Sequence, residues 1–357
     1  MNTLQGARHL RSISVLDFSR SIFGIALFLF ATPVPAQELS VASAKPEKAD
    51  AIVSSDGSGT QTNLQSALDA APNDSTNPYL ILIKPGIYKG HVSIPANKPN
   101  LILRGEAGAT AKTVVTDGHN INALGPDGKK LGTPDSATVL VRARNFTAEN
   151  ITFENTAGNH GQALAMYVAA DRAIFRNCRF LGWQDTLRAD APRGGIGRQY
   201  FTNCEIVGHV DFIYAAGTSV FDRCHIHCLA DGYITAASTP ENVPFGYVFL
   251  NCRITAEPIV KGVYLGRPWR PFAATAFLNT EMPEQIRPEG WNNWRNAANE
   301  KTARYAEYHS TGPGARPEAR VKWARQLSDE EAKIYTVENI LKGDDGWNPT
   351  RGQSESR

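Results

Sequence analysis

The chain contains no hydrophobic run long enough to cross a bilayer as a helix, which takes roughly 20 apolar residues. One apolar run, residues 22–31, lies near the N-terminus and is too short for this purpose. A strong net charge is also lacking, because 37 Lys and Arg are set against 35 Asp and Glu, for a formal charge of +2. This balance gives no support to a nucleic-acid partner, although it would not repel an anionic polymer.

Cysteine is scarce as well, and its count is odd. The five cysteines are Cys178, Cys204, Cys224, Cys228 and Cys252. At least one thiol is therefore unpaired within the chain, and a protein of this size does not depend on a disulfide framework. A disulfide between Cys178 and Cys204 and a pair of buried, stacked thiols are both open.

The run from Cys224 to Cys228 (CHIHC) suggests a metal site at first sight. On a strand, however, the two cysteines would face inward and the two histidines outward, because successive side chains alternate. Four ligands placed in this way cannot converge on one zinc ion. We therefore expect no metal.

The first 36 residues have the order of an export signal. Three arginines precede the apolar run, and the segment closes on Val34-Pro35-Ala36 before Gln37. This order is typical of a cleavable signal peptide. We expect a signal peptide at 1–36, a flexible segment at 37–50 and a secreted or periplasmic protein; an uncleaved membrane anchor is the alternative.

A short pattern recurs through the middle of the chain: Phe, any residue, usually Asn, then Cys or Thr. Its phenylalanines are 20 to 28 residues apart and are Phe153, Phe175, Phe201, Phe221, Phe249 and Phe277. Irregular periods of this length, with β-branched flanks and no helical stretch between them, are typical of a solenoid of parallel strands. The predicted fold class is all-β, a parallel β-helix.

Stacking of coils explains each residue type in the pattern. Strands of successive coils lie about 4.8 Å apart, so equivalent phenylalanines would form an interior aromatic stack. Asn tolerates the left-handed backbone conformation and can bend the chain, which lets the Phe before it and the Cys or Thr after it both face inward. Stacked Asn amides could also hydrogen-bond from coil to coil.

Both ends of such a solenoid need a cover, because an open end exposes core and unpaired strand edges. Helical spacing predicts a short capping helix that contains Leu64, Ala67, Leu68 and Ala71. Near the other end, Ser328 and Glu331 form a capping-box pattern, which opens a helical stretch toward Gly343. We expect one domain over residues 51–350 and a disordered tail at 351–357.

The repeat brings candidate chemical groups into register. Gln162 and Gln184 each lie nine residues after a repeat phenylalanine, and Asp185 and Asp211 each lie ten after one. Stacked coils would therefore bring two carboxylates and two carboxamides together. Adjacent like charges are unfavourable on a structural surface, so the cluster suggests a functional site. Solvated turn aspartates and a glutamine ladder are the alternative.

A close pair of carboxyl groups can divide its protonation, one member ionised and the other carrying a proton. The ionised member can attack a carbonyl carbon, and the protonated one can donate to a leaving alkoxide. Glutamine amides suit the oxyanion that develops. The set favours acyl transfer from an ester over glycosidic cleavage.

Two points stay open in this reasoning. Gln184 and Asp185 are sequence neighbours, and on an extended strand they would face opposite ways. Asp231 lies ten residues after Phe221, so register alone does not separate it from the other two aspartates.

Four blocks of the sequence resemble, in order, the signature segments of pectin methylesterases: Gly161–Ala165, Gln184–Leu187, Asp211–Tyr214 and Leu265–Trp269. The likeness continues outward to Asp56–Gly59 and Tyr305–Tyr308 and covers most of the chain beyond the signal. The resemblance implies a right-handed parallel β-helix, in agreement with the repeat.

The resemblance also implies a role for each matching residue. Asp211 would be the nucleophile, and Asp185 the general acid and then the base. Gln162 and Gln184 would be the oxyanion donors, and Arg267 would hold Asp211 ionised and oriented. Trp269 and, by a looser match, Thr133 would contact the substrate.

The chain departs from the usual family pattern at three places. Gly90 stands where Glu is usual, and Tyr214-Ala215 stands where Phe-Gly is usual. Residues 188–197 form a longer connection than usual and are expected to make a loop beside the cleft. Trp291 and Trp294 fit either a sugar-binding surface or the core.

The sequence thus predicts a carboxylic ester hydrolase that removes methyl esters from pectin, releasing methanol and pectate, without a cofactor. Pectin and water would be its reactants, and the protein would be a monomer. Three alternative functions are compatible with the predicted fold: a polygalacturonase or lyase, an esterase or thioesterase for another acyl group, and a polysaccharide-binding solenoid without activity. The paired glutamines argue against a lyase, and the presence of both aspartates argues against a mere binding module.

Overall fold

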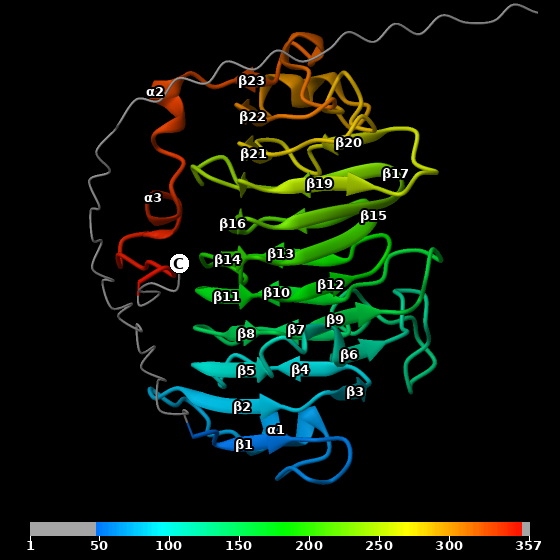
Figure 1. Ribbon diagram of the computed structural model, residues 1–357, viewed down its shortest axis with the longest axis vertical. Helices are drawn as coiled ribbons and strands as arrows, with labels where there is room; N and C mark the ends of the chain where they lie inside the picture. Colours follow the sequence, from blue (N-terminus) through cyan, green and yellow to red (C-terminus); the bar gives the residue numbers. More distant parts are fainter. Residues whose placement is uncertain (1–47, 352–357) are drawn as a thin grey trace, which may run out of the picture. The chain divides into compact units, whose positions relative to one another are not determined.

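The computed structural model describes residues 48–351, in which parallel strands are stacked coil upon coil (Figure 1). The predicted export signal at 1–36 lies outside the described residues, as do residues 37–47 and 352–357 of the two predicted flanking segments. Every pair of strands named below is parallel. The all-β parallel β-helix expected from the repeat is confirmed.

One side of the stack is an 11-stranded sheet that follows the chain from its first described strand to its last. In spatial order its strands are β1 (Ala51–Val53), β2 (Tyr79–Ile83), β5 (Leu101–Gly105), β8 (Thr147–Glu149), β11 (Ala173–Arg176), β14 (Arg198–Thr202), β16 (Thr218–Asp222), β18 (Tyr247–Leu250), β21 (Ala274–Leu278), β22 (Arg304–Tyr308) and β23 (Arg325–Gln326).

The remaining strands form a 12-stranded sheet with two branches that meet in one long strand, β15 (Glu205–Ala215). One branch contains β3 (Gly86–Lys89), β6 (Thr113–Asp117), β9 (Thr152–Asn155) and β12 (Arg179–Leu181). The other contains β4 (Val92–Ile94), β7 (Val139–Val141), β10 (Met166–Ala169) and β13 (Leu187–Asp190). Beyond β15 the sheet continues through β17 (His225–Ala237) to β19 (Arg253–Ala256) and β20 (Val263–Gly266).

Phenylalanines fill the interior as the repeat predicted, with one exception. The rings of Phe175, Phe201, Phe221, Phe249 and Phe277 stack in order with centroids 4.2 to 4.7 Å apart. Each of these side chains is fully buried. Ring stacking between adjacent coils therefore runs along five coils of the 11-stranded sheet.

The assignment of Phe153 to this stack was wrong. Phe153 lies on β9 of the other sheet and pairs with Phe180, while the partner of Phe175 on the preceding coil is Ala148. Accordingly, Asn155 has an ordinary strand conformation, and it is Asn150 that is left-handed, with φ 59°. The Phe-x-Asn pattern at 153–155 resembles the repeat but lies on β9, the strand after the bend, rather than on β8 before it.

The remaining asparagines bend the chain as expected. Asn177, Asn203, Asn251 and Asn279 have φ values between 51° and 53°, and Arg223 replaces Asn in this conformation at φ 53°. Amide-to-amide hydrogen bonds join Asn177 to Asn150 (3.2 Å) and Asn279 to Asn251 (3.5 Å). The residue that follows each of these five bends, Cys in four cases and Thr280 in the fifth, is buried. All five cysteines of the chain are free thiols. The open question of a disulfide is thereby answered.

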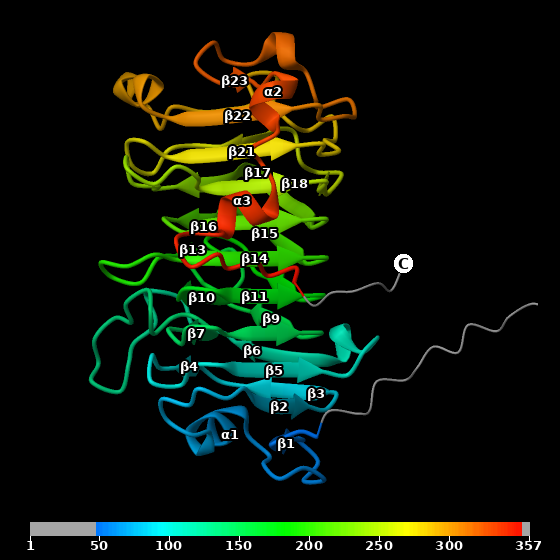
Figure 2. The same cartoon turned by 90° about the vertical axis from the view of Figure 1, so that its left-hand side faces the viewer.

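The predicted helix over the N-terminal end is present, whereas the helical segment near the C-terminus does not cover the other end. Helix α1 (Leu64–Ala70) buries Leu64, Ala67 and Leu68 over the first coil, with Asn63 as its N-cap. At the other end the Ser328–Glu331 capping box is formed, but the helix that it opens, α2 (Asp329–Ala332), is short. A second helix, α3 (Val337–Leu341), starts anew at the N-cap Thr336. The continuous stretch expected toward Gly343 is thus two helices, which lie along the 11-stranded sheet (Figure 2). Short 3-10 turns cover residues Thr110–Lys112, Ala297–Lys301 and Pro317–Ala319.

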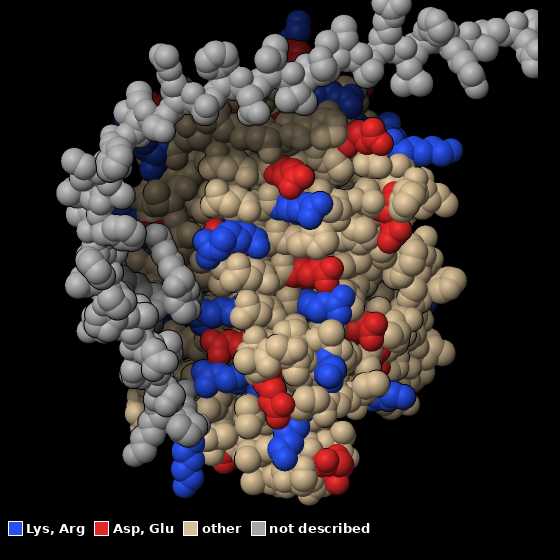
Figure 3. Space-filling model, viewed as in Figure 1, with Lys and Arg blue, Asp and Glu red and all other residues tan. Residues whose placement is uncertain are grey.

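Charged side chains on the outer surface follow the stack of coils. On the face in Figure 3, basic and acidic side chains alternate over the strands. The Arg104 side chain pairs with Glu149 at 2.6 Å, and Arg176 of the next coil pairs with the same carboxylate at 3.3 Å. Opposite charges on adjacent coils avoid the like-charge contacts that a parallel stack of identical residues would create.

Candidate active site

Asp185 and Asp211 lie on adjacent coils, as their equal offsets from the repeat predicted. Their strands pair with Leu187 opposite Ile213, and the amide of Asp185 donates to the carbonyl of Val210 at 3.2 Å. The two residues are only 3% and 7% exposed. Two carboxyl groups are therefore nearly buried side by side.

The backbone at both aspartates is left-handed, with φ 67° at Asp185 and 51° at Asp211. This conformation reverses the usual alternation of side chains along a strand. It explains how Gln184 and Asp185, neighbours in sequence, both line one cavity. The strand bends at the site.

The cavity has a volume of about 200 Å³. Its lining residues are Gln162, Gln184, Asp185, Asp211, Tyr214, Ala236, Arg267, Trp269 and Trp294. Six of these were predicted from the sequence. Thr133 is not among them: it lies in the loop between β6 and β7, where its carbonyl accepts a hydrogen bond from Ser136.

Arg267 fixes the position of Asp211 through two hydrogen bonds. Its Nε and Nη2 donate to the two carboxylate oxygens at 2.9 and 2.7 Å. The guanidinium carbon also lies 3.8 Å from the ring centres of both Tyr233 and Trp294. A planar guanidinium held by two rings and one carboxylate has little freedom to rotate.

Burial raises the pKa of Asp185 to about 7, and the negative charge of Asp211 adds to the increase. Gln162, whose Nε2 donates to Asp185 Oδ2 at 3.1 Å, acts in the opposite direction, as do Tyr214 and Arg188. Near neutral pH, Asp185 can therefore hold a proton that an ordinary aspartic acid would have lost.

Burial also raises the pKa of Asp211, but the hydrogen bonds and positive charge of Arg267 oppose this effect, as does His209. Asp211 has a cation bound to both of its oxygens, whereas Asp185 has none. Of the pair, Asp211 is thus the better carboxylate and Asp185 the better acid.

Two residues of the cavity were missed as site candidates in the sequence. Tyr214 was noted only as a departure from the family pattern, and its position on β15, three residues after Asp211, could have marked it. Trp294 was left open between the site and the core. It lines the cavity, whereas Trp291 is 1% exposed and packs in the interior.

Asp231 lies outside the site because the register changes. Opposite β15, the partner of Gly208 is Cys228, but the partner of Val210 is Tyr233. The extra residues of β17 carry Asp231 to the surface, where its carboxylate accepts from the backbone amides of Lys261 and Gly262.

The long connection expected at 188–197 is shorter than predicted. Residues up to Asp190 belong to strand β13, and only residues 191–197 form the loop. The strand assignment follows from pairing of Tyr167 with Arg188 and of Arg188 with Tyr214.

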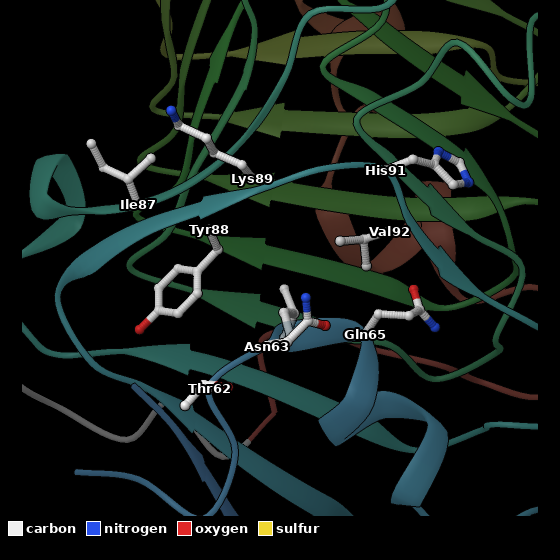
Figure 4. Close-up of a pocket in the computed structure, with 9 residues that line it drawn as sticks. Thr62, Asn63, Gln65, Ile87, Tyr88, Lys89, His91 and Val92 are labelled. Atoms are coloured by element: carbon white, nitrogen blue, oxygen red, sulfur yellow. The ribbon is translucent and has the colours of Figure 1, made fainter. Parts of the chain in front are cut away.

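A second hollow lies between the start of α1 and strands β3 and β4 (Figure 4). Its volume is about 100 Å³, and its lining includes Lys89 and His91 but no carboxylate. Across residues 48–351, no group of three or more His, Cys, Asp or Glu side chains is arranged to hold a metal ion. The cavity at Asp185 and Asp211 is therefore the candidate active site.

A family model, Pectinesterase, matches residues 50–344 of the chain. The chain belongs to the pectinesterase family. It is accordingly an esterase. Among curated proteins, Pectinesterase 31 of Arabidopsis thaliana is 42% identical over 295 residues, which are 81% of this chain and 91% of the relative.

Solved pectin methylesterases share this fold. The enzyme from carrot superposes with a TM-score of 0.77 at 33% identity, over 85% of this chain and 96% of its own. The enzyme from Erwinia chrysanthemi gives 0.72 at 32% identity, over 85% and 99%. The pectinesterase fold was thus predicted correctly from the repeat and the four sequence blocks.

Proposed function

We propose that this pectinesterase hydrolyses the methyl esters of pectin, with Asp211 as the nucleophile and Asp185 as the general acid and base. The observation that carries the proposal is the unequal pair: Asp211 is bound by Arg267, while Asp185 has its pKa raised to about 7. A carboxylate beside a carboxylic acid supplies both the nucleophile and the proton donor for ester cleavage without a metal.

The first half of the reaction forms an acyl-enzyme. A carboxylate oxygen of Asp211 attacks the carbonyl carbon of the methyl ester, and the electrons of the C=O bond move onto oxygen. When the C–O bond to the methoxy group breaks, Asp185 gives its proton to the departing oxygen, and methanol leaves. Asp185 is then ionised, and Asp211 is joined to the sugar acid as an anhydride.

The second half returns the enzyme to its starting state. Asp185, now a carboxylate, takes a proton from water as the water oxygen attacks the anhydride carbon. The bond to Asp211 breaks, which leaves a free carboxyl group on the polymer and restores the Asp211 carboxylate. One ester and one water thus become one acid and one methanol.

Gln162 and Gln184 are proposed to stabilise the oxyanion of each tetrahedral intermediate. Both side chains line the cavity, on the same side of the stack as the aspartates. Gln162 uses one N–H for Asp185 at 3.1 Å, and its amide nitrogen carries a second N–H that is free to meet the oxyanion. Donors of this kind typically contribute on the order of 100-fold in rate.

The substrate is proposed to be pectin, a methyl-esterified polymer of galacturonate. A solved pectin methylesterase that is 32% identical to this chain is described in complex with a hexasaccharide, which supports a chain of sugars as the ligand. Trp269 and Trp294 line the cavity and offer flat faces to a sugar ring. A contact of Thr133 with the substrate stays part of the proposal, although this residue lies outside the cavity.

The protein is proposed to act outside the cytoplasm as a monomer and without a cofactor. The N-terminal 36 residues support export by their order of charged, apolar and small residues. Within residues 48–351, no helix is long and apolar enough to span a membrane.

The deciding experiment measures methanol released from highly methylated pectin by the wild type, Asp211→Ala and Asp231→Asn. We expect release by the wild type, a loss of at least about 1000-fold in Asp211→Ala, and near wild-type release in Asp231→Asn. Asp231 is a matched control because it lies ten residues after its repeat phenylalanine but is exposed outside the cavity. Absence of methanol with the wild type would exclude the substrate, and undiminished release by Asp211→Ala would exclude the mechanism.

A further inference from the structure

Tyr214 is a buried phenol at the wall of the active-site cavity. Its side chain is 5% exposed, and its hydroxyl makes no well-aligned hydrogen bond within residues 48–351. Buried hydroxyl groups without a partner are rare, because the loss of water is not compensated.

The position of Tyr214 is fixed by three neighbouring coils. Tyr167 on β10, Arg188 on β13 and Tyr214 on β15 occupy one row across the sheet. The Arg188 guanidinium lies 4.6 Å from the centre of the Tyr167 ring and 5.4 Å from that of Tyr214. Arg188 is in turn held by Asp190, with Nη2 to Oδ2 at 2.7 Å. This row holds the Tyr214 ring at the wall of the cavity that Asp185 also lines.

We propose that Tyr214 is a positioning residue for Asp185, whose ionised form it stabilises by donating a hydrogen bond from its hydroxyl. The inference deepens the proposed function and rests on it. Asp185 must be a carboxylate in the second half of the reaction, after it has given its proton to methanol. A carboxylate accepts several hydrogen bonds, and Gln162 supplies only one of them, to Oδ2.

The groups that face Asp185 leave Tyr214 as the donor of choice. Asp211 carries negative charge and raises the pKa of Asp185, while Tyr214, Gln162 and Arg188 lower it. Arg188 is committed to Asp190 through two hydrogen bonds, at 2.9 and 2.7 Å. Arg267 is bound to Asp211 through two hydrogen bonds, and the charge of His209 lowers the pKa of Asp211.

Burial and the charge of Asp185 raise the pKa of Tyr214 well above its ordinary value. The phenol therefore stays protonated throughout the working range and can act only as a donor toward a neighbouring carboxylate. Tyr214 and Asp185 are both buried and line the same cavity. A hydrogen bond from the phenol to the carboxylate would be charge-assisted and therefore stronger than a neutral one.

The first test needs no substrate. The Asp185 carboxyl carbon is followed by ¹³C NMR during a pH titration of protein labelled with [4-¹³C]aspartate, and Asp185→Asn assigns the signal. We expect Tyr214→Phe to raise the pKa of Asp185 by roughly one unit, the loss expected for one hydrogen bond to a charged group. Tyr167→Phe is the matched control, because Tyr167 contacts the same Arg188 but lies outside the cavity lining, and it should leave this pKa unchanged.

The second test separates the two halves of the reaction. In Tyr214→Phe the second half should slow, because Asp185 is reprotonated more readily before it can act as base. We expect a burst of about one methanol per enzyme molecule before the steady state, the signature of an acyl-enzyme that accumulates. The fall of kcat/KM with increasing pH should also move upward by roughly one unit.

An Asp185 pKa that is the same in Tyr214→Phe and wild type would overturn the inference, and so would an equal shift in Tyr167→Phe. If the wild type released no methanol from pectin, the proposed function would fail on its own. The substrate-free titration would still decide whether Tyr214 controls the ionisation of Asp185.

Discussion

Asp185 and Asp211 show how a repeat can be modified into a site at the scale of single residues. Both have a left-handed backbone, which costs a residue other than Gly of order 1 kcal/mol or more. Elsewhere in the stack, asparagines take up this conformation at bends between strands. At the site, aspartates take it up instead, and the same bend turns a carboxyl group into the cavity. The local strain is thus what places the reacting groups.

Asp185 should lower the stability of the fold at neutral pH. Its pKa is about 7 in the folded state against an ordinary value of 3.8, so the folded protein binds its proton more tightly than the unfolded chain does. Stability from this group is greatest at low pH and falls as the pH rises from about 4 to 7. The difference corresponds to about 4 kcal/mol of unfolding free energy above pH 7, as an order of magnitude.

Asp185→Asn should therefore be inactive yet more stable than the wild type at pH 8, by up to about 4 kcal/mol. Asn is also well suited to the left-handed backbone at this position. Denaturant unfolding at pH 8, 6 and 4 checks this prediction. The gain in stability should shrink as the pH falls and be absent at pH 4. Equal stability of the two proteins at pH 8 would show that the ionised Asp185 does not destabilise the folded state.

Arg267→Lys tests whether the two hydrogen bonds from Arg267 to Asp211 matter for the reaction. Lysine cannot donate two parallel hydrogen bonds or stack flat between Tyr233 and Trp294. We expect kcat to fall on the order of 100-fold, as for other lost preorganised charges. The pKa of Asp211 should rise without the guanidinium, so activity should fall most at acidic pH, where the nucleophile becomes protonated.

A pH profile of methanol release for this variant is the measurement, with Arg287→Lys as the control. The Arg287 guanidinium lies 5.2 Å from the ring centre of Tyr264, which stacks on Tyr233, but Arg287 lies outside the cavity. If both variants lost the same activity, the effect would come from the packing of arginine on the tyrosine rings rather than from the contact with Asp211.

At the scale of the elements, the phenylalanine stack is the central packing device of the fold. Phe249 lies between Phe221 and Phe277, with ring centres 4.6 and 4.2 Å away, and is fully buried. Phe249→Ala should lower the free energy of unfolding by about 3 to 5 kcal/mol, because it removes both ring contacts and leaves a cavity. Chemical denaturation measures the change, and Ile259→Ala, at a side chain that is 78% exposed, should be within about 0.5 kcal/mol of the wild type.

The repeat correctly predicted that the two site aspartates lie on adjacent coils, but it placed its own first phenylalanine in the wrong sheet. The spacing of Asp185 and Asp211 from Phe175 and Phe201 is a property of the stacked coils, so it carried over into the structure. Phe153 failed because its own coil has Ala148 at the stack position. A pattern of three residues does not reveal which of two sheets a strand joins, since both sheets bury phenylalanine.

Other features depend on irregularities that periodicity does not contain. The register shift between Gly208 and Val210 removes Asp231 from the site, and only the pairing of β15 with β17 reveals it. The cavity position of Gln184 depends on the left-handed Asp185 that follows it. A sequence rule that assumes ideal strands therefore cannot decide whether Asp231 and Gln184 belong to the site.

On the scale of the whole described chain, the C-terminal segment runs back along the solenoid. From β23 at one end, α2 and α3 return along the 11-stranded sheet toward β14 (Figures 1 and 2). Ile340 and Leu341 pack on the outer face of that sheet in a small apolar cluster with Tyr200 and Val220. The segment therefore joins coils that are far apart in the stack.

Arg198 is the polar anchor of this segment. Its Nη1 donates to Asp345 Oδ1 at 2.6 Å and to the carbonyl of Leu341 at 3.1 Å, and its Nη2 donates to Asp171 Oδ2 at 2.7 Å. The guanidinium is buried, and the pairing holds the pKa of Asp345 well below its usual range. A buried cation with this many partners is costly to remove, because the partners remain.

Arg198→Ala should therefore release the C-terminal segment without affecting catalysis. We expect the free energy of unfolding to fall by about 2 to 4 kcal/mol and limited proteolysis to cut first within residues 333–351. Methanol release should stay near the wild-type value, because the cavity residues lie on β15 and β17 of the other sheet or in the loops beside its strands. Arg253→Ala removes an exposed ion pair with Glu281 and should change stability by less than about 1 kcal/mol. Loss of activity in Arg198→Ala at full folding would instead show that the two sheets are coupled through the core.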